Sequence, residues 1–293
     1  MSRPTRPFRS VLYIPASKAR ALEKAQTLPV DAIIFDLEDA VTVEEKENAR
    51  TLLVETLSKG DYGPRARLIR VNGLDTAWGR ADLDAAMTLG PDAVLLPKVE
   101  SAEQVAEVAA ALDRQALCGA TQVWAMIETP RGVLTAPEIA AAPRMGGFVI
   151  GTNDLAKDLG TRDRADRMPL MTALQSCVLA ARASGIAVID GVYNAFRDED
   201  GLRAECEQGR DLGMDGKSLV HPAQIAIANE IFAPTDAEIA LARRQIAAFE
   251  EAEARGEGVA VVDGRIVEHL HVATARAMLA QAEAIQGLAR EAA

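Results

Sequence analysis

The chain has 293 residues, of which 49% are hydrophobic, and carries a formal net charge of −11 at pH 7. This length and apolar content fit one large folded domain with an appended unit and exclude an intrinsically disordered chain. The basic residues are scattered on an acidic protein, which argues against a nucleic-acid partner. Because there is no secretory signal pattern and no apolar stretch long enough to span a membrane, we expect a cytoplasmic protein.

Eight apolar segments rich in Val, Ile and Leu recur along the chain, and each is followed by a helical pattern. Their continuous hydrophobicity is typical of parallel strands buried on both faces. We expect a (β/α)8 TIM barrel over residues 1–233. A doubly wound open sheet is the alternative, but no Gly-x-Gly-x-x-Gly motif follows the first segment. The eight expected strands are 11–15, 32–37, 67–72, 93–98, 122–128, 147–151, 187–190 and 217–221.

Helix-start signals support this phasing. Thr42 to Glu45 and Ser101 to Gln104 read as capping boxes, and Thr129-Pro130 supplies a cap with a proline in the first turn. We therefore expect helices to begin just after the second, fourth and fifth strands.

The pattern changes from residue 234 onward. A third capping box at 235–238 opens a helix, Asp263-Gly264 predicts a hairpin, and a final helix is expected over 272–289. We expect residues 234–293 to form a small appended unit, and on pattern alone a C-terminal lid and an oligomerisation arm are about equally expected.

Polar residues close most of the apolar segments. In a barrel the carboxyl ends of the strands form the reaction face, so these residues are expected to lie together. For any one of them alone, a solvated loop charge or a helix cap is the favoured interpretation, but for all of them together that interpretation is much weaker. They are Asp36, Glu38, Asp39, Arg70, Asn72, Lys98, Glu100, Glu128, Asn153, Asp154, Asp190 and His221.

Glu128 and Asp154 are the first candidates for a metal site. Each follows a buried segment, and carboxylates without a Cys or His cluster favour a hard cation such as Mg²⁺. Asp154 has an alternative role as a helix cap. Arg70 lies within an apolar segment, so its guanidinium should meet either a neighbouring carboxylate or an anionic ligand, and a metal nearby favours the ligand.

Eight motifs in order give the chain a resemblance to the citrate lyase beta-subunit-like family, which includes malyl-CoA and citramalyl-CoA lyases and malyl-CoA thioesterases. The resemblance covers nearly the whole chain. The motifs are Arg9-Ser-Val-Leu-Tyr-Ile-Pro, Phe35-Asp-Leu-Glu-Asp-Ala-Val, Arg70-Val-Asn, Leu96-Pro-Lys-Val-Glu, Met126-Ile-Glu-Thr-Pro, Gly151-Thr-Asn-Asp-Leu, Asp190-Gly-Val-Tyr and His221-Pro-Ala-Gln.

The resemblance implies a barrel that depends on Mg²⁺ or Mn²⁺ and assembles as a trimer or hexamer. It implies Glu128 and Asp154 as metal ligands, with Glu38 and Asp39 around the metal-bound waters. Arg70 would clamp a substrate oxygen, and Asn153 would also contact the substrate. Three further positions, Tyr13, Lys18 and Lys24, would lie near the coenzyme A part of the substrate.

The reaction implied first is carbon–carbon cleavage of malyl-CoA or citramalyl-CoA to acetyl-CoA and a 2-oxo acid. Where the family lid carries Asp and Pro, this chain has Glu268 and Leu270. Glu268 keeps the carboxylate of the acid/base group but adds a methylene, which alters its placement.

Three alternatives remain open. Hydrolysis of malyl-CoA to malate and coenzyme A would use the same residues. The chain could also be the citryl lyase subunit of a citrate lyase complex. A class II pyruvate aldolase is a further alternative, but the segment Asp36 to Asp39 lacks the histidine base of that class.

Overall fold

The computed structural model describes residues 6–291. Its described residues divide into two compact units, one of residues 8–232 and one of residues 233–291 together with Arg6 and Pro7. Among the described residues, no helix combines the length and apolar character needed to cross a membrane.

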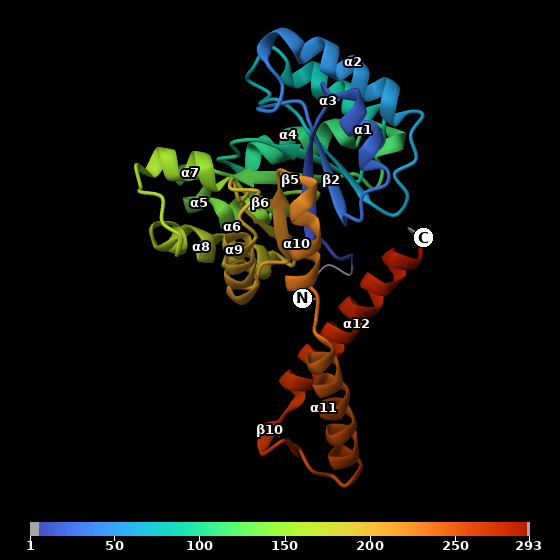
Figure 1. Ribbon diagram of the computed structural model, residues 1–293, viewed down its shortest axis with the longest axis vertical. Coiled ribbons are helices and arrows are strands. Elements are labelled where there is room, and N and C mark those ends of the chain that lie inside the picture. Colours follow the sequence, from blue (N-terminus) through green and yellow to red (C-terminus); the bar gives the residue numbers. More distant parts are fainter. Residues whose placement is uncertain (1–5, 292–293) are drawn as a thin grey trace. The chain divides into compact units, whose positions relative to one another are not determined.

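Eight parallel strands close the first unit into a barrel in which β8 pairs with β1, so the predicted (β/α)8 fold is confirmed (Figure 1). All eight predicted strands are present. They are β1 (Ser10–Pro15), β2 (Ala32–Asp36), β3 (Ala66–Arg70), β4 (Ala93–Leu96), β5 (Gln122–Ile127), β6 (Met145–Ile150), β7 (Ala187–Asp190) and β8 (Gly216–Leu219).

Helices connect the strands of the barrel unit and pack around them (Figure 1). The α-helices are α1 (Ala19–Ala25), α2 (Lys46–Leu57), α3 (Gly79–Met87), α4 (Ala102–Leu112), α5 (Pro130–Leu134), α6 (Ala136–Ala140), α7 (Thr152–Leu159), α8 (Met171–Ser184), α9 (Glu199–Leu212) and α10 (Ile225–Ile231). Short 3₁₀ turns are η1 (Val43–Glu45), η2 (Ala116–Cys118), η3 (Met168–Leu170) and η4 (Pro222–Gln224).

Several strands end earlier than predicted. Asn72, Lys98 and His221 lie in loops beyond β3, β4 and β8 instead of inside the strands. Lys98 has a φ of 48°, a left-handed conformation that cannot continue a strand. The apolar run continues into each loop, which is why the sequence predicts strand there. In the structure the backbone N–H groups of these three residues donate to side chains, those of Asp82, Glu128 and Gln224, instead of to a neighbouring strand.

Three of the predicted helix caps are confirmed. Gln104 Oε1 accepts a hydrogen bond from Ser101 N, Thr129 Oγ1 accepts one from Gly132 N, and Thr235 with Glu238 forms a capping box. The predicted box at Thr42 is wrong, because its side chain makes no cap hydrogen bond and η1 intervenes before α2. The buried Lys46 amine, which donates to the carbonyls of Leu37 and Glu38, positions this segment instead.

Side chains alternate along each strand between the barrel interior and the layer under the helices. The interior group includes Ile34, Leu68, Met126 and Val149. Their neighbours along the strands, such as Phe35, Ile69, Ile127 and Ile150, belong to the larger apolar core outside the barrel. This alternation decides which polar residues at the strand ends point inward.

The second unit contains α11 (Asp236–Ala254), β9 (Ala260–Val262), β10 (Arg265–Val267) and α12 (His269–Glu291). The predicted hairpin is confirmed, with positive φ at Asp263 and Gly264 as a tight turn requires. The helix α12 begins three residues before the predicted start at residue 272. His271 Nδ1 accepts a hydrogen bond from Glu268 N and so caps the extra turn.

Candidate functional site

Three charged residues face the barrel interior because they continue the alternation of their strands. Asp36 lies two residues after Ile34, and Arg70 lies two residues after Leu68. Glu128 lies two residues after Met126 and is 3% exposed. The sequence placed these residues at strand ends, and the strand register now brings them into one space.

Asp36 holds Arg70 in a fixed orientation. The two residues are register partners on β2 and β3, and Arg70 Nε donates to Asp36 Oδ1 at 2.7 Å while Nη2 donates to Oδ2. Asp36 also accepts hydrogen bonds from the backbone N–H groups of Glu38 at 2.8 Å and Ala40 at 3.1 Å. The sequence placed Asp36 on the reaction face without assigning it a role. The signal that could have revealed a role is the alternation of side chains along the strand, which points Asp36 into the barrel.

Arg70 also contacts the next two acids. Its Nη1 lies 2.8 Å from Glu38 Oε2 and 3.8 Å from Asp39 Oδ2. Glu38 is buried, whereas the Asp39 side chain is 65% exposed. The sequence allowed two partners for the Arg70 charge, a neighbouring carboxylate or an anionic ligand. In the structure Arg70 pairs with neighbouring carboxylates. Its role as a substrate clamp stays a prediction.

Tyr13 lies against Arg70 inside the barrel. The Arg70 Cζ is 4.9 Å from the centre of the Tyr13 ring, and the Tyr13 hydroxyl lies 3.8 Å from Met126 Sδ. Burial raises the pKa of Tyr13, so the phenol stays neutral. The structure thus gives Tyr13 a place beside Arg70, where its ring limits the movement of the guanidinium.

Glu128 lies at the end of β5 with its carboxylate enclosed by backbone. Its Oε1 accepts a hydrogen bond of 2.7 Å from Lys98 N, and a Cβ on Gly151 would collide with the carboxylate. Burial raises the pKa of Glu128 to about 7. Glycine at position 151 is therefore required for this close approach.

Lys98 connects the remaining acids. Its Nζ lies 3.1 Å from Glu38 Oε1 and 3.7 Å from Asp154 Oδ2. Asp154 is in the first turn of α7, where its carboxylate is also favoured by the helix dipole. The sequence placed Lys98 on the reaction face without a role. We call the group Asp36, Glu38, Asp39, Arg70, Lys98, Glu128 and Asp154 the acidic cluster.

The donor set of the acidic cluster fits a hard divalent cation. Among residues 6–291, no group of three or more His, Cys, Asp or Glu is arranged to hold a metal ion. Mg²⁺ commonly takes one or two protein carboxylates and completes its shell with water and substrate oxygens. Glu128 is a buried carboxylate in a backbone cradle, and both it and Asp154 contact Lys98, so these two residues fit such a partial ligand set.

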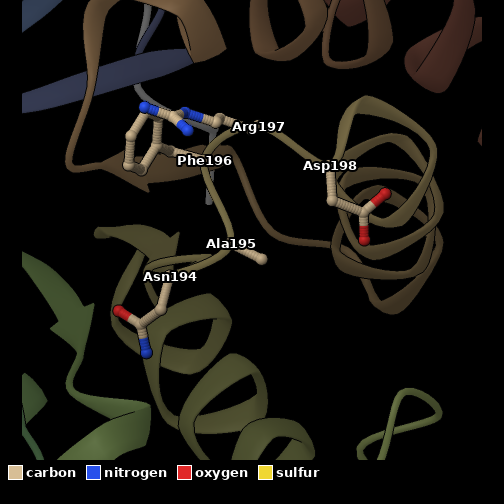
Figure 2. Close-up of a pocket in the computed structure, with 5 residues that line it drawn as sticks. All are labelled: Asn194, Ala195, Phe196, Arg197 and Asp198. Atoms are coloured by element: carbon tan, nitrogen blue, oxygen red, sulfur yellow. The ribbon is translucent and has the colours of Figure 1, made fainter.

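Asn153 joins α7 to the loop that follows β7. Asn153 Oδ1 accepts a hydrogen bond of 2.9 Å from Asn194 Nδ2. An open pocket of about 610 Å³ lies along this loop, lined by residues 194–198, and Figure 2 shows Asn194 at one end of it and Asp198 at the other. Phe196 stacks on His221 with ring centres 4.5 Å apart, so the loop packs against the segment that follows β8.

The other predicted site residues are on surfaces. Lys18 precedes α1 with its side chain 61% exposed, and Lys24 lies in the last turn of that helix. Glu268 is exposed in the second unit, directly before α12. Their roles toward coenzyme A and in proton transfer stay predictions.

Asp190 lies away from the reaction face, contrary to its predicted place there. It points outward, accepts two hydrogen bonds from Arg167 Nη1 at 2.8 and 2.9 Å, and lies 3.1 Å from Lys217 Nζ. Glu205 completes the group at 2.7 Å from Lys217 Nζ. The prediction failed because side chains alternate along β7, so Asp190, two residues after the outward-facing Val188, also points out of the barrel. We call these four residues the balanced cluster.

Comparisons with known proteins give concordant matches. The model of the HpcH/HpaI aldolase/citrate lyase family matches residues 9–222. The chain is 62% identical over 285 residues to a (3S)-malyl-CoA thioesterase of Cereibacter sphaeroides, covering 97% of this chain and 98% of the relative. It is 36% identical over 295 residues to the citrate lyase subunit beta of Escherichia coli, covering 99% and 97%.

A solved structure extends this similarity. It is the protein CitE of Mycobacterium tuberculosis in complex with magnesium, acetoacetate and coenzyme A. The TM-score is 0.79 at 30% sequence identity, and the match covers 96% of this chain and 100% of that one.

Proposed function

Because the chain belongs to the HpcH/HpaI aldolase/citrate lyase family, we propose that it is a thioesterase that hydrolyses (3S)-malyl-CoA to malate and coenzyme A. The observation that carries this proposal is the 62% identity to the Cereibacter thioesterase over nearly the full length of both chains. The sequence motifs put carbon–carbon cleavage first and this hydrolysis second, and the relatives favour the second.

Carbon–carbon cleavage remains the other candidate. It is favoured by the 36% identity to the Escherichia coli citrate lyase subunit and by the similarity to CitE. Both reactions begin with the same step, in which a hydroxyacyl thioester binds with its oxygen atoms near the acidic cluster. They differ in whether water attacks the thioester or a carbon–carbon bond breaks.

Glu128 and Asp154 would hold Mg²⁺, or Mn²⁺ as a second hard cation, in this enzyme. Support comes from the carboxylate donor set and from the magnesium named in the CitE complex. When bound, the ion supplies Lewis-acid polarisation of the substrate oxygens. Glu38 and Asp39 would accept hydrogen bonds from water at its edge, and Asn153 would donate its amide to the acyl group.

Arg70 would stabilise the negative charge that develops on the thioester oxygen. Its position is fixed in advance, because Asp36 binds two of its nitrogens and Tyr13 packs against its plane. Charge stabilisation of this kind is effective when the donor needs no reorganisation during the reaction. Lys18 and Lys24 would supply the local positive charge that an acidic protein needs to bind the phosphates of coenzyme A.

The second unit would serve as a lid, with Glu268 as its proton-transfer group, in a trimeric or hexameric assembly. A closing lid protects an activated thioester from uncontrolled contact with bulk water. In hydrolysis Glu268 would take a proton from the attacking water, and in cleavage it would exchange one with the acetyl carbon.

A product assay separates the two candidates. The purified protein is incubated with synthetic (3S)-malyl-CoA and with citramalyl-CoA in the presence of Mg²⁺, and both products are quantified by chromatography. From malyl-CoA, equal amounts of malate and free coenzyme A support the thioesterase, whereas glyoxylate and acetyl-CoA support the lyase. From citramalyl-CoA, cleavage would give pyruvate and acetyl-CoA. Turnover by the isolated chain would exclude a strict requirement for partner subunits, and no turnover of either substrate would contradict both candidates.

The Glu268→Asp variant tests the lid residue. Shortening the side chain moves the carboxylate by about one methylene, and proton transfer is sensitive to such displacements. We expect the ratio of hydrolysis to cleavage products to change by about tenfold. An unchanged ratio and rate would remove Glu268 from the reaction.

A further inference from the structure

Lys98 is held in an unusual backbone conformation at the centre of the acidic cluster. Its φ of 48° lies in the left-handed region, which costs a residue with a Cβ free energy that glycine does not pay. This conformation directs Lys98 N toward Glu128 Oε1, to which it donates a hydrogen bond of 2.7 Å. The strained backbone thus fixes the orientation of the Glu128 carboxylate.

The side chain of Lys98 has a second set of contacts. Its ammonium lies 3.1 Å from Glu38 Oε1 and 3.7 Å from Asp154 Oδ2, and the side chain is half exposed. A half-exposed lysine ammonium is protonated at neutral pH, so it places a positive charge beside these two carboxylates. One residue therefore organises three carboxylates, through its backbone and its charge.

We propose that Lys98 is a positioning residue of the acidic cluster. Its N–H orients Glu128, while its ammonium balances Glu38 and Asp154 and competes with a divalent cation for Asp154. This inference rests on the proposed function, which takes Glu128 and Asp154 as the Mg²⁺ ligands. Competition follows from charge, since a monovalent ammonium near the carboxylate lowers the electrostatic attraction available to Mg²⁺.

Three substitutions test the charge of Lys98 while its backbone N–H to Glu128 is kept. Lys98→Gly removes the ammonium and keeps the N–H, because glycine adopts a φ of 48° without strain. Lys98→Met removes the charge and keeps most of the side-chain length. Lys98→Arg keeps the charge. As a matched control, Lys157→Met removes an ammonium that is 77% exposed and 4.0 Å from Asp158.

The measurements are Mg²⁺ affinity by titration calorimetry and thermal unfolding with and without Mg²⁺. We expect Lys98→Gly and Lys98→Met to bind Mg²⁺ about tenfold more tightly than the wild type. We expect Lys98→Met, which keeps the strained backbone, to unfold at a lower temperature than the wild type before Mg²⁺ is added, and both neutral variants to be stabilised more when it is added. Lys98→Arg and Lys157→Met should stay close to wild-type affinity.

Unchanged or weaker Mg²⁺ binding by both neutral variants would overturn the inference. A lower unfolding temperature with wild-type Mg²⁺ affinity would reduce Lys98 to an ordinary structural ion pair, and would also overturn it. If the wild type itself bound no Mg²⁺ at millimolar concentration, the metal assignment of the proposed function would fail as well. The wild-type titration therefore distinguishes the two failures.

Discussion

The acidic cluster and the balanced cluster both lie on the barrel unit, but they differ in their balance of charge. The balanced cluster joins two cations, Arg167 and Lys217, to two anions, Asp190 and Glu205, in contacts of 2.7 to 3.5 Å. The acidic cluster joins five carboxylates to only two cations, Arg70 and Lys98.

The pKa values follow this difference. Although burial opposes ionisation of Asp190, Lys217 and Arg167 together lower its pKa. In the acidic cluster, burial raises the pKa of Glu128 to about 7 and also raises that of Glu38. A cluster whose charges are compensated stabilises the fold, whereas a cluster with excess negative charge gains from binding a cation. The comparison therefore favours a structural role for the balanced cluster and supports the proposed cation site in the acidic cluster.

The largest expected effect is on activity, from Glu128→Gln. Replacing the carboxylate with an amide should lower turnover of malyl-CoA by about a thousandfold or more, because a proposed metal ligand is lost. The fold should remain as stable as the wild type, since a buried carboxyl of raised pKa becomes a neutral amide. Steady-state rates, Mg²⁺ titration and thermal unfolding would measure both effects. A full rate with no need for Mg²⁺ would contradict the assignment of Glu128.

The matching change in the balanced cluster is Lys217→Met. It removes a fully buried ammonium and leaves Asp190 and Glu205 with Arg167 alone, so we expect a loss of about 3 kcal/mol in unfolding free energy. Denaturant unfolding would measure the loss. The exposed Lys157→Met serves as the control and should change the unfolding free energy by less than about 0.5 kcal/mol. Stability equal to the wild type in Lys217→Met would show that the balanced cluster is dispensable.

Arg70→Lys tests the one cation that is buried in the acidic cluster. Lysine keeps the charge but cannot bind both oxygens of Asp36 and also reach Glu38. We expect turnover to fall by about a hundredfold with little change in Mg²⁺ affinity. Rates and calorimetry on the same preparation would decide this. A small loss of turnover would limit Arg70 to its ion pairs with the neighbouring acids.

The smallest expected effect is a dependence of Mg²⁺ affinity on pH. Burial holds the pKa of Glu128 near 7, so below that pH a proton competes with the metal ion for this carboxylate. Affinity should weaken by up to about tenfold for each pH unit below 7 and level off above it. Calorimetric titrations at several pH values would measure the trend. Constant affinity between pH 5 and 7 would show either that Glu128 is not protonated there or that it does not bind the ion.

Because its pKa is raised, Glu128 should stabilise the fold more at low pH than at neutral pH. A carboxylate paired with a cation has the opposite dependence on pH. Its pKa is raised in the folded protein, so folding takes up a proton between the unfolded pKa and about 7. Without divalent cations, its contribution to stability is fully present below the unfolded pKa and is lost as pH rises toward 7. Glu128→Gln should lack this trend, and thermal unfolding at several pH values compares the two proteins.

The order of the eight strands and the C-terminal hairpin were predictable from the sequence. Buried parallel strands read as continuous apolar runs, and Asp263-Gly264 forms a tight turn whatever its surroundings, because the information is local. The presence of polar residues at the strand ends was predictable for the same reason. The boundaries near Lys98 and the cap at Thr42 were not, since long-range contacts decide them.

The partners of each charge were decided only by the tertiary structure. Asp36 and Arg70 are 34 residues apart and meet because β2 and β3 align them as register partners. Side-chain parity sends Glu128 into the barrel and Asp190 out of it, although both lie at strand ends. The sequence by itself determined that carboxylates gather at the carboxyl ends of the strands. Strand register and parity decided which of them are paired with cations and which are left in excess, because electrostatic energy depends on distances that no local pattern specifies.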